Sequence, residues 1–217
     1  MVTVPEAVEK IVGRSRYLAE AMSKEIVNNS SLARYIKPEI EEMLVKKVSD
    51  SAIIMALNRL SRKIKPKYST KNIFKTSPDM ILRSNLMLIN LRSSKELEDK
   101  SQTMLRLADE RDFLTITKGV FDTTIIASTS LKKEIKKILK DGMSIKQFGK
   151  MSAITIRLPK EAPGTPGIFY FFLKSLAWEG INIIEIVSAN QELTLIVNDK
   201  DANRTFSILR SLFSKII

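Results

Sequence analysis

Residues 49–63 carry polar side chains at a helical spacing that could contact nucleic acid. Asn58 and Arg62 are four residues apart, so a helix places both on one face, together with Ser51 and Met55. Arginine suits the edges of guanine and asparagine suits the edges of adenine, so this face is a candidate for reading bases. The alternative interpretation is an ordinary solvated helix surface, which such a face forms more often.

Positive charge is concentrated around the same segment. The chain has 36 Lys and Arg residues against 24 Asp and Glu residues, a net charge of +12. Nine of the basic residues lie between positions 46 and 75, with Asp50 as the only acidic residue there. A basic patch attracts polyanions through counterion release, so DNA is a candidate partner; the alternative is a general preference for Lys and Arg at the surface. The candidate nucleic-acid contacts are Lys47, Ser51, Asn58, Arg59, Arg62, Lys63, Lys65, Lys67 and Lys71.

The apolar pattern predicts the helices that position this face. A long helical stretch runs from Pro5 to Asn28, and a short helix covers residues 32–36. Pro38 separates the short helix from the next one. Ser49 is a typical N-cap for a helix that runs to about residue 63, whose buried stripe lies opposite the polar face.

The segment 33–64, which reads ARYIKPEIEEMLVKKVSDSAIIMALNRLSRKI, resembles a winged helix-turn-helix domain. Tyr68, Ile73 and Phe74 would supply a short hairpin, the wing, whose neighbouring lysines contact phosphates. The resemblance places this domain at residues 1–76 and implies DNA binding. The alternative is a helical module that forms dimers or docks a protein partner.

The residue inventory argues against catalysis. The chain contains no cysteine and no histidine, which excludes disulfides, thiolate chemistry and cysteine-ligated zinc and removes the commonest general base. Its seven glycines form no phosphate-binding loop. Glu185 and Glu192 could be a pair of carboxylates for acid–base work, but exposed strand positions are the favoured interpretation. We therefore expect no enzyme activity, no catalytic residue, no cofactor and no metal site.

The chain shows no sign of membrane targeting. Its first residues, MVTVPEAVEK, lack an apolar core flanked by basic residues, so no signal peptide is predicted. The longest apolar run, residues 168–173, is too short to span a bilayer. We expect a cytoplasmic protein with no membrane partner.

After Ser77 and Pro78 the chain contains two units with the same order of elements. The first repeat, residues 77–150, has predicted strands at 86–91, 113–117, 123–128 and 145–148 and helices at 95–110 and 131–140. The second repeat, residues 151–217, has predicted strands at 153–158, 182–188 and 193–198 and helices at 167–179 and 202–213. Only residues 215–217 remain for its last strand, which is therefore short or comes from elsewhere. The order βαββαβ is a ferredoxin-like arrangement.

The second repeat contains a compact motif. A turn with Pro166 and Gly167 opens an apolar helix, Gly180 closes it, and Asn182 begins the next strand. This combination resembles the ACT domain, of the aspartokinase type. The resemblance implies a homodimer with domains side by side and a small ligand, usually an amino acid, between the loop opening the first helix and the second strand of the neighbouring unit. It places candidate ligand contacts at Gly164, Thr165, Pro166, Gly167, Ile168, Asn182 and Ile183.

Physical chemistry supports that assignment. Glycines let the backbone approach a ligand closely, and N–H groups at a helix N-terminus suit a carboxylate. Asn182 offers a donor and an acceptor to an ammonium or carboxylate group. The alternative is that Pro166 and Gly167 form only a turn and Asn182 only a cap, as in ACT domains that serve as dimerisation modules.

Three features depart from the ACT pattern. Residues 169–172 are all aromatic, which favours burial against a partner. The first repeat lacks the Pro-Gly turn, so any site would be asymmetric. No kinase domain precedes the repeats, so the aspartokinase reaction does not carry over.

These patterns predict an α+β protein with an N-terminal all-α helix-turn-helix domain, with or without a wing, followed by two ferredoxin-like βαββαβ ACT units. The predicted function is a ligand-responsive regulator, a DNA-binding transcriptional regulator whose ACT pair senses an amino acid. The alternative is a non-catalytic regulatory subunit that binds an enzyme of amino-acid metabolism.

Overall fold

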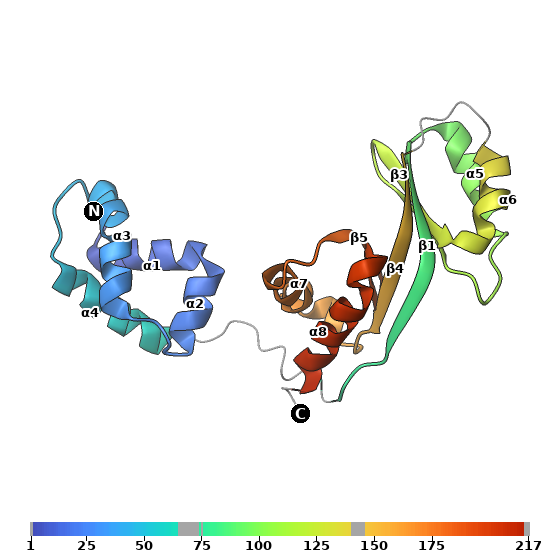
Figure 1. The fold of residues 1–217 in the computed structure, drawn as a ribbon. Coiled ribbons are helices and arrows are strands. Elements are labelled where there is room, and N and C mark those ends of the chain that lie inside the picture. The colour runs from blue at the N-terminus through green and yellow to red at the C-terminus, as the bar shows by residue number, and fades with distance from the viewer. Residues whose placement is uncertain (1, 65–73, 75, 140–145, 215–217) are drawn as a thin grey trace. The chain divides into compact units, whose positions relative to one another are not determined.

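The computed structural model describes residues 2–64, 74, 76–139 and 146–214. The chain forms two compact units, which we call the N-terminal unit (residues 1–69) and the sheet unit (residues 70–217) (Figure 1). The α+β class predicted from the sequence is confirmed.

The N-terminal unit consists, in the part that the structure describes, of the helices α1 (Val4–Arg14), α2 (Arg16–Ser23), α3 (Asn29–Leu44) and α4 (Asp50–Lys63). Their apolar sides meet in one core around residues such as Val8, Ile36 and Leu57. The Ser49 hydroxyl accepts a hydrogen bond from the backbone N–H of Ala52, which confirms the predicted N-cap of α4.

Two helix boundaries differ from the predictions. The stretch predicted from Pro5 to Asn28 is broken at Ser15, whose extended backbone ends α1 and precedes α2. Gly13 and Ser15 both lower helix propensity locally, which accounts for the break. Conversely, Pro38 does not separate two helices, because α3 continues through it. Proline inside a helix is unfavourable, and the buried side chains of α3 on both sides of it offset that cost.

An ion pair joins α3 to the first turn of α4. The Lys37 ammonium donates a hydrogen bond to Asp50 at 2.7 Å. This hydrogen bond, together with the charge of Lys37, lowers the pKa of Asp50 below its ordinary value of 3.8. A carboxyl group with a lowered folded-state pKa contributes stability above its unfolded pKa, and that stability is lost as the pH falls through the folded pKa.

Replacing this lysine is therefore expected to weaken the acid dependence of the N-terminal unit. In Lys37→Met the pKa of Asp50 returns toward 3.8, so less stability is lost between about pH 6 and about pH 2 than in the unmodified chain. Urea unfolding followed by circular dichroism at the two pH values measures this. Lys10→Met, on the exposed side of α1, is the matched control. If Lys37→Met and Lys10→Met lose the same amount of stability between the two pH values, the Lys37–Asp50 pair does not cause the acid dependence.

The sheet unit is built on one antiparallel sheet of six described strands. Its strand order is β2-β3-β1-β4-β6-β5. The strands are β1 (Met80–Arg92), β2 (Leu114–Lys118), β3 (Asp122–Ser128), β4 (Lys146–Arg157), β5 (Ile183–Ala189) and β6 (Glu192–Asn198). The helices are α5 (Lys95–Leu105), α6 (Lys132–Leu139), α7 (Ile168–Trp178) and α8 (Ala202–Ser214).

Strands β1 and β4 each serve both repeats. The first half of β1, residues 80–83, pairs with residues 153–156 of β4, next to β6. The second half of β1, from residue 86, pairs with β3 and with the first half of β4. Each repeat therefore has the ferredoxin-like order of four strands: the first half of β4 completes the first repeat, and the second repeat takes its fourth strand, residues 80–83, from the start of β1.

The sharing of β1 and β4 corrects two predictions. The strands predicted at 145–148 and 153–158 are one continuous strand, β4. The missing last strand of the second repeat is the first half of β1, so it comes from elsewhere in the chain, one of the two options that the sequence left open. Asn85 and Lys150 lie at the irregularities where the pairing changes, both with a positive φ of 58°. Such bulges let one strand turn from one half of the sheet into the other.

The two pairs of helices lie toward opposite ends of the long strands β1 and β4 (Figure 1). Helices α5 and α6 pack on the first repeat over Met87 and Ile125, and α7 and α8 pack on the second repeat over Ile154 and Leu195. Because side chains alternate along a strand, neighbouring residues face away from these helices. They form a third buried cluster shared by β1, β3, β4 and β6, which includes Leu86, Leu88, Ile126, Met151, Ala153 and Ile196.

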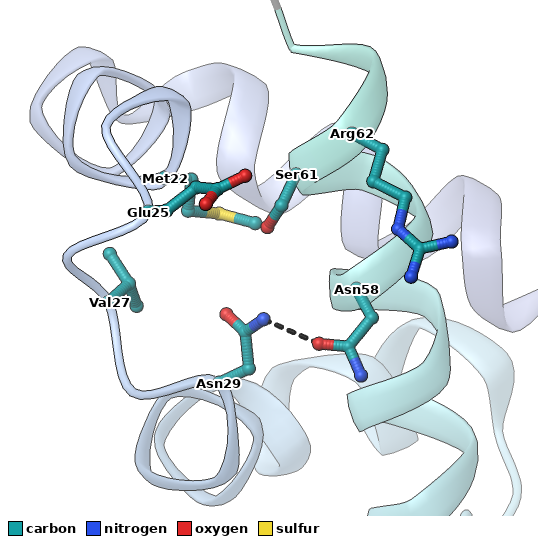
Figure 2. Close-up of a pocket in the computed structure, with 7 residues that line it drawn as sticks. All are labelled: Met22, Glu25, Val27, Asn29, Asn58, Ser61 and Arg62. Atoms are coloured by element: carbon teal, nitrogen blue, oxygen red, sulfur yellow. Dashed lines mark hydrogen bonds between the residues drawn. The ribbon is translucent and has the colours of Figure 1, made fainter.

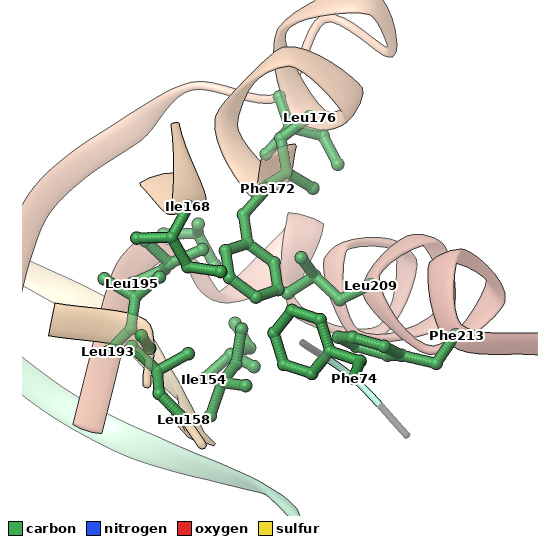
Figure 3. Packing of buried hydrophobic residues seen from close by; sticks show 14 of the residues in the cluster. Phe74, Ile154, Leu158, Ile168, Phe172, Leu176, Leu193, Leu195, Leu209 and Phe213 are labelled. Carbon is green, nitrogen blue, oxygen red and sulfur yellow. The ribbon is translucent and has the colours of Figure 1, made fainter. Parts of the chain in front are cut away.

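Phe74 is buried in the sheet unit, with 2% of its surface exposed. Its ring lies 5.9 Å from the rings of Phe171 and Phe172 and 4.9 Å from that of Phe213, between α7 and α8 (Figure 3). The prediction that Phe74 belongs to a wing of the N-terminal domain is therefore wrong, because an aromatic side chain gains more by burial among three others than in an exposed hairpin. Tyr68 and Ile73 lie outside the described residues.

Candidate ligand-binding site

The connection between β4 and α7 forms one wall of a pocket of about 480 Å³. A short 3-10 turn, Ala162–Gly164, shapes this connection, and the buried Ala162 anchors it. The backbone N–H of Leu158 donates to Gln191 at 2.6 Å, which ties the connection to the turn between β5 and β6. The pocket is lined by Leu158, Ala162, Pro163, Thr165, Pro166, Gly167, Ile168, Phe169, Tyr170, Ser188 and Asn190.

The start of α7 opens into this pocket without a side-chain cap. Gly167 occupies the N-cap position with φ of 86°, a conformation that glycine adopts without strain, and has no side chain to cap the first turn. The hydroxyl of Thr165 donates to the carbonyl of Glu161 at 2.7 Å, so it stabilises the loop. The first-turn N–H groups of α7 can therefore bind an anion, which the helix dipole favours.

The hairpin of β5 and β6 also contributes to the lining of the pocket. Ser188 is near the end of β5, and Asn190 follows in the two-residue turn with φ of 50°. Asparagine tolerates this left-handed conformation, so its amide can be held at the pocket. Neither residue was among the predicted ligand contacts, although the polar break between the two predicted strands indicated a turn there.

The predicted ligand contacts fall into two groups. Thr165, Pro166, Gly167 and Ile168 all line the pocket. The other three do not line it: Gly164 lies in the exposed 3-10 turn, Asn182 is exposed before β5, and Ile183 pairs with Val197 within the sheet.

The corresponding helix of the first repeat, α5, starts with a side-chain cap. Only Ser93 and Ser94 connect β1 to α5. The Ser94 hydroxyl accepts from the N–H of Leu97 at 3.1 Å, so a side chain already occupies the position that a ligand would take. The starts of α5 and α7 therefore differ, and the asymmetry of any ligand site stays a prediction.

The predicted nucleic-acid contacts lie on the surface of the N-terminal unit where they are described. Lys47, Ser51, Asn58, Arg59, Arg62 and Lys63 are exposed, and Lys65, Lys67 and Lys71 lie outside the described residues. The amide oxygen of Asn58 accepts a hydrogen bond from Asn29 at 2.7 Å, so this candidate base reader contacts the start of α3. The helix-turn-helix assignment stays a prediction.

Other chemistry is sparse in the described part of the chain. Among its residues, no group of three or more His, Cys, Asp or Glu side chains could hold a metal ion. None of the helices described there is long and apolar enough to cross a bilayer. Glu185 and Glu192 lie toward opposite ends of the β5–β6 hairpin, so they do not form a close pair of carboxylates.

No protein-family model and no curated protein matches the chain. Solved structures do match it. A crystal structure of aspartokinase α and β subunits is 18% identical and covers 64% of this chain and 99% of that one, with a TM-score of 0.52. The ligand-free regulatory subunit of aspartate kinase from Thermus thermophilus is 14% identical, with 64% and 99% covered and a TM-score of 0.51. Aspartate kinase from Clostridium acetobutylicum is 15% identical, with 64% and 35% covered and a TM-score of 0.51. Over about two thirds of its length, this chain therefore has the fold found in aspartokinase regulatory subunits, and the ACT-like fold predicted from the sequence is confirmed.

Proposed function

We propose that this chain is a non-catalytic regulatory protein whose sheet unit binds a free amino acid in the pocket at the start of α7. The observation that carries the proposal is the pocket itself, which is lined both by an uncapped helix N-terminus and by the polar residues Ser188 and Asn190. A regulatory role is supported by the fold that the chain shares with a protein named as a regulatory subunit.

Each part of an α-amino acid has a counterpart in this pocket. The first-turn N–H groups of α7 suit its carboxylate. The side-chain oxygens of Ser188 and Asn190 can accept hydrogen bonds from its ammonium group. Leu158, Ile168 and Phe169 supply apolar surface for its side chain. The volume of about 480 Å³ lies within the range of roughly 300–1,000 Å³ common for small-molecule sites.

A homodimer would add to this site. Strand β5 is at the edge of the sheet, and Ile186 on it is 41% exposed; Phe169 and Tyr170 at the pocket are 43% and 38% exposed. Apolar groups along a sheet edge favour burial against a second copy. In the proposed dimer Asn182 of one copy lies near the ligand held by the loop of the other, as the ACT resemblance implies.

A thermal-shift screen of the full chain against the twenty amino acids tests the proposal. A ligand that binds only the folded state stabilises it, by about 2.7 kcal/mol when present at a hundred times its Kd. A selective rise in Tm with one amino acid or a related group is expected. If no amino acid raises Tm, the sheet unit is a dimerisation scaffold and the proposal fails.

Substituting Asn190 with glycine is expected to weaken amino-acid binding about tenfold or more. The change removes an amide that contacts the charged ligand, and a hydrogen bond to a charged group is worth about 1.5–3 kcal/mol. Glycine keeps the left-handed turn, so the hairpin should stay intact. Isothermal calorimetry measures the affinity.

Asn182→Ala is the informative comparison for this variant. If both variants bind the amino acid more weakly, Asn182 of the second copy contributes to the site. If only Asn190→Gly binds it more weakly, the site lies within one chain. Unchanged affinity in both would rule out this pocket.

We also propose how ligand binding has its effect: the N-terminal unit binds DNA. The exposed basic side chains on and before α4 support this, including Lys47, Arg59 and Arg62. A ligand that favours one arrangement of the dimer would change its fit to two half-sites, a coupling of typically about 1–3 kcal/mol. Fluorescence anisotropy with duplex DNA at several salt concentrations tests this, because phosphate contacts make log K fall with log salt. Failure to bind DNA at low salt would contradict it.

A second candidate function is docking to an enzyme of amino-acid metabolism. The match to the Thermus thermophilus regulatory subunit favours it, because that protein is named as a subunit of a kinase and 99% of that chain is covered. Co-purification followed by mass spectrometry would identify such an enzyme, and its activity should then respond to the amino acid found in the thermal-shift screen. An unaltered activity in the presence of this chain would rule the candidate out.

A further inference from the structure

The N-terminal unit contains a pocket of its own, of about 330 Å³. It lies between the end of α2, the α2–α3 connection, the start of α3 and the last turns of α4 (Figure 2). Its lining residues are Met22, Glu25, Val27, Asn29, Asn58, Ser61 and Arg62. Neither the ligand site in the sheet unit nor DNA binding accounts for it.

Glu25 is held at this pocket in a backbone conformation that favours glycine. The N–H of Glu25 donates to Met22 and the N–H of Ile26 donates to Ala21, which together form a Schellman motif at the end of α2. In this motif Glu25 has φ of 56°, where glycine is the usual residue. Local folding alone would therefore select glycine, and the side chain of Glu25 adds a carboxylate that the helix end does not need.

Asn29 lines the same pocket and carries an unsatisfied acceptor. Its amide nitrogen donates to Asn58 at 2.7 Å, which fixes the orientation of the amide. The amide oxygen of Asn29 is then buried without a hydrogen-bond partner. Buried acceptors normally have partners, so an unpaired one at a pocket indicates a missing donor.

Ser61 adds a third acceptor. Its hydroxyl donates to the carbonyl of Leu57 at 3.0 Å, which leaves the lone pairs of the oxygen available. Figure 2 shows the side-chain oxygens of Glu25, Asn29 and Ser61 around one space, with Met22 and Val27 beside it. Arg62 lines the rim of this pocket from α4.

We propose that this pocket binds the primary ammonium group of a small molecule. The three N–H groups of an ammonium ion match the three acceptors from Glu25, Asn29 and Ser61, and the carboxylate balances its charge. Met22 and Val27 contact the adjoining carbon chain. Arg62 selects, among such amines, those that also carry a carboxylate. The N-terminal unit thus senses an amine directly, independently of the sheet unit.

Nuclear magnetic resonance of the 15N-labelled full chain tests this with ethylammonium chloride. The expected result is a saturable shift of the side-chain amide signals of Asn29 and Asn58. Tetramethylammonium chloride at the same concentration carries the same charge but no N–H, so it should give no such shift. Ethylammonium has no carboxylate for the start of α7, so binding in the sheet unit does not produce this result.

Two substitutions of Glu25 complete the test. Glu25→Gln should weaken ethylammonium binding about tenfold or more, whereas Glu9→Gln, the same change on exposed α1, should not. Glu25→Gly should abolish binding while raising Tm, since glycine suits this backbone, so the loss would not be due to unfolding. The proposal is overturned if ethylammonium gives no saturable shift, if tetramethylammonium shifts the same signals equally, or if Glu25→Gln retains the affinity.

Discussion

Phe74→Ala is expected to destabilise the sheet unit by about 3–5 kcal/mol, the usual cost of truncating a buried phenylalanine. The side chain is 2% exposed and contacts the rings of Phe171, Phe172 and Phe213, so its loss leaves a cavity between α7 and α8. Since typical domains are stable by only about 5–15 kcal/mol, this is a large fraction of the total. Hydrogen exchange with mass spectrometry measures it, because peptides of the two units are read separately in the intact chain.

The same substitution at Phe121 provides a matched control. Phe121 lies between β2 and β3 and is 81% exposed, so Phe121→Ala should leave the exchange of the sheet unit unchanged. Peptides of the N-terminal unit should exchange equally in all three proteins. Similar protection in Phe74→Ala and Phe121→Ala would show that the aromatic cluster does not depend on Phe74.

A fragment of residues 151–217 is expected not to fold, although it contains the whole second repeat predicted from the sequence. Without β1, strand β4 loses its partner along residues 153–156, and the core loses Phe74 and the contact of Met80. A chain of this size buries too little apolar surface to tolerate such a loss. Circular dichroism and the dispersion of proton resonances would measure the outcome.

The fragment 70–217 is the comparison for this experiment, since it holds every described strand of the sheet. It should give a dispersed spectrum, and a peptide of residues 70–84 added to the 151–217 fragment should restore part of the structure. A folded 151–217 fragment on its own would show that the borrowed strand is dispensable.

The local elements of this fold were largely predictable from the sequence because short-range rules decide them. The cap at Ser49 and the apolar stripe that follows it depend on neighbouring residues, and both are found in α4. The pairing of residues 80–83 with the second repeat was not predictable in this way. Nothing near residues 80–83 indicates that their partner lies about seventy residues away, because pairing across a sheet depends on the whole topology. The continuity of α3 through Pro38 likewise depends on burial in the core, which overrides local propensity.

The same distinction between local and long-range signals applies to the candidate ligand site. Glycine and proline mark the loop before α7 directly in the sequence, and Thr165 to Ile168 do line the pocket. Ser188 and Asn190 were missed because they reach it only through the register of a hairpin and the hydrogen bond from Leu158 to Gln191. Phe74 was assigned to the wrong unit because its position next to a basic segment says nothing about the three rings that surround it.

The two long strands also determine how the sheet unit can be transferred to another protein. A cut or an inserted protein around residue 150 would interrupt β4, whose two halves pair with the two halves of β1. The smallest piece that can be transferred to another protein is therefore the whole sheet unit, joined before Phe74. A chimaera that respects this boundary carries both repeats as one body, because β1 and β4 run through both of them.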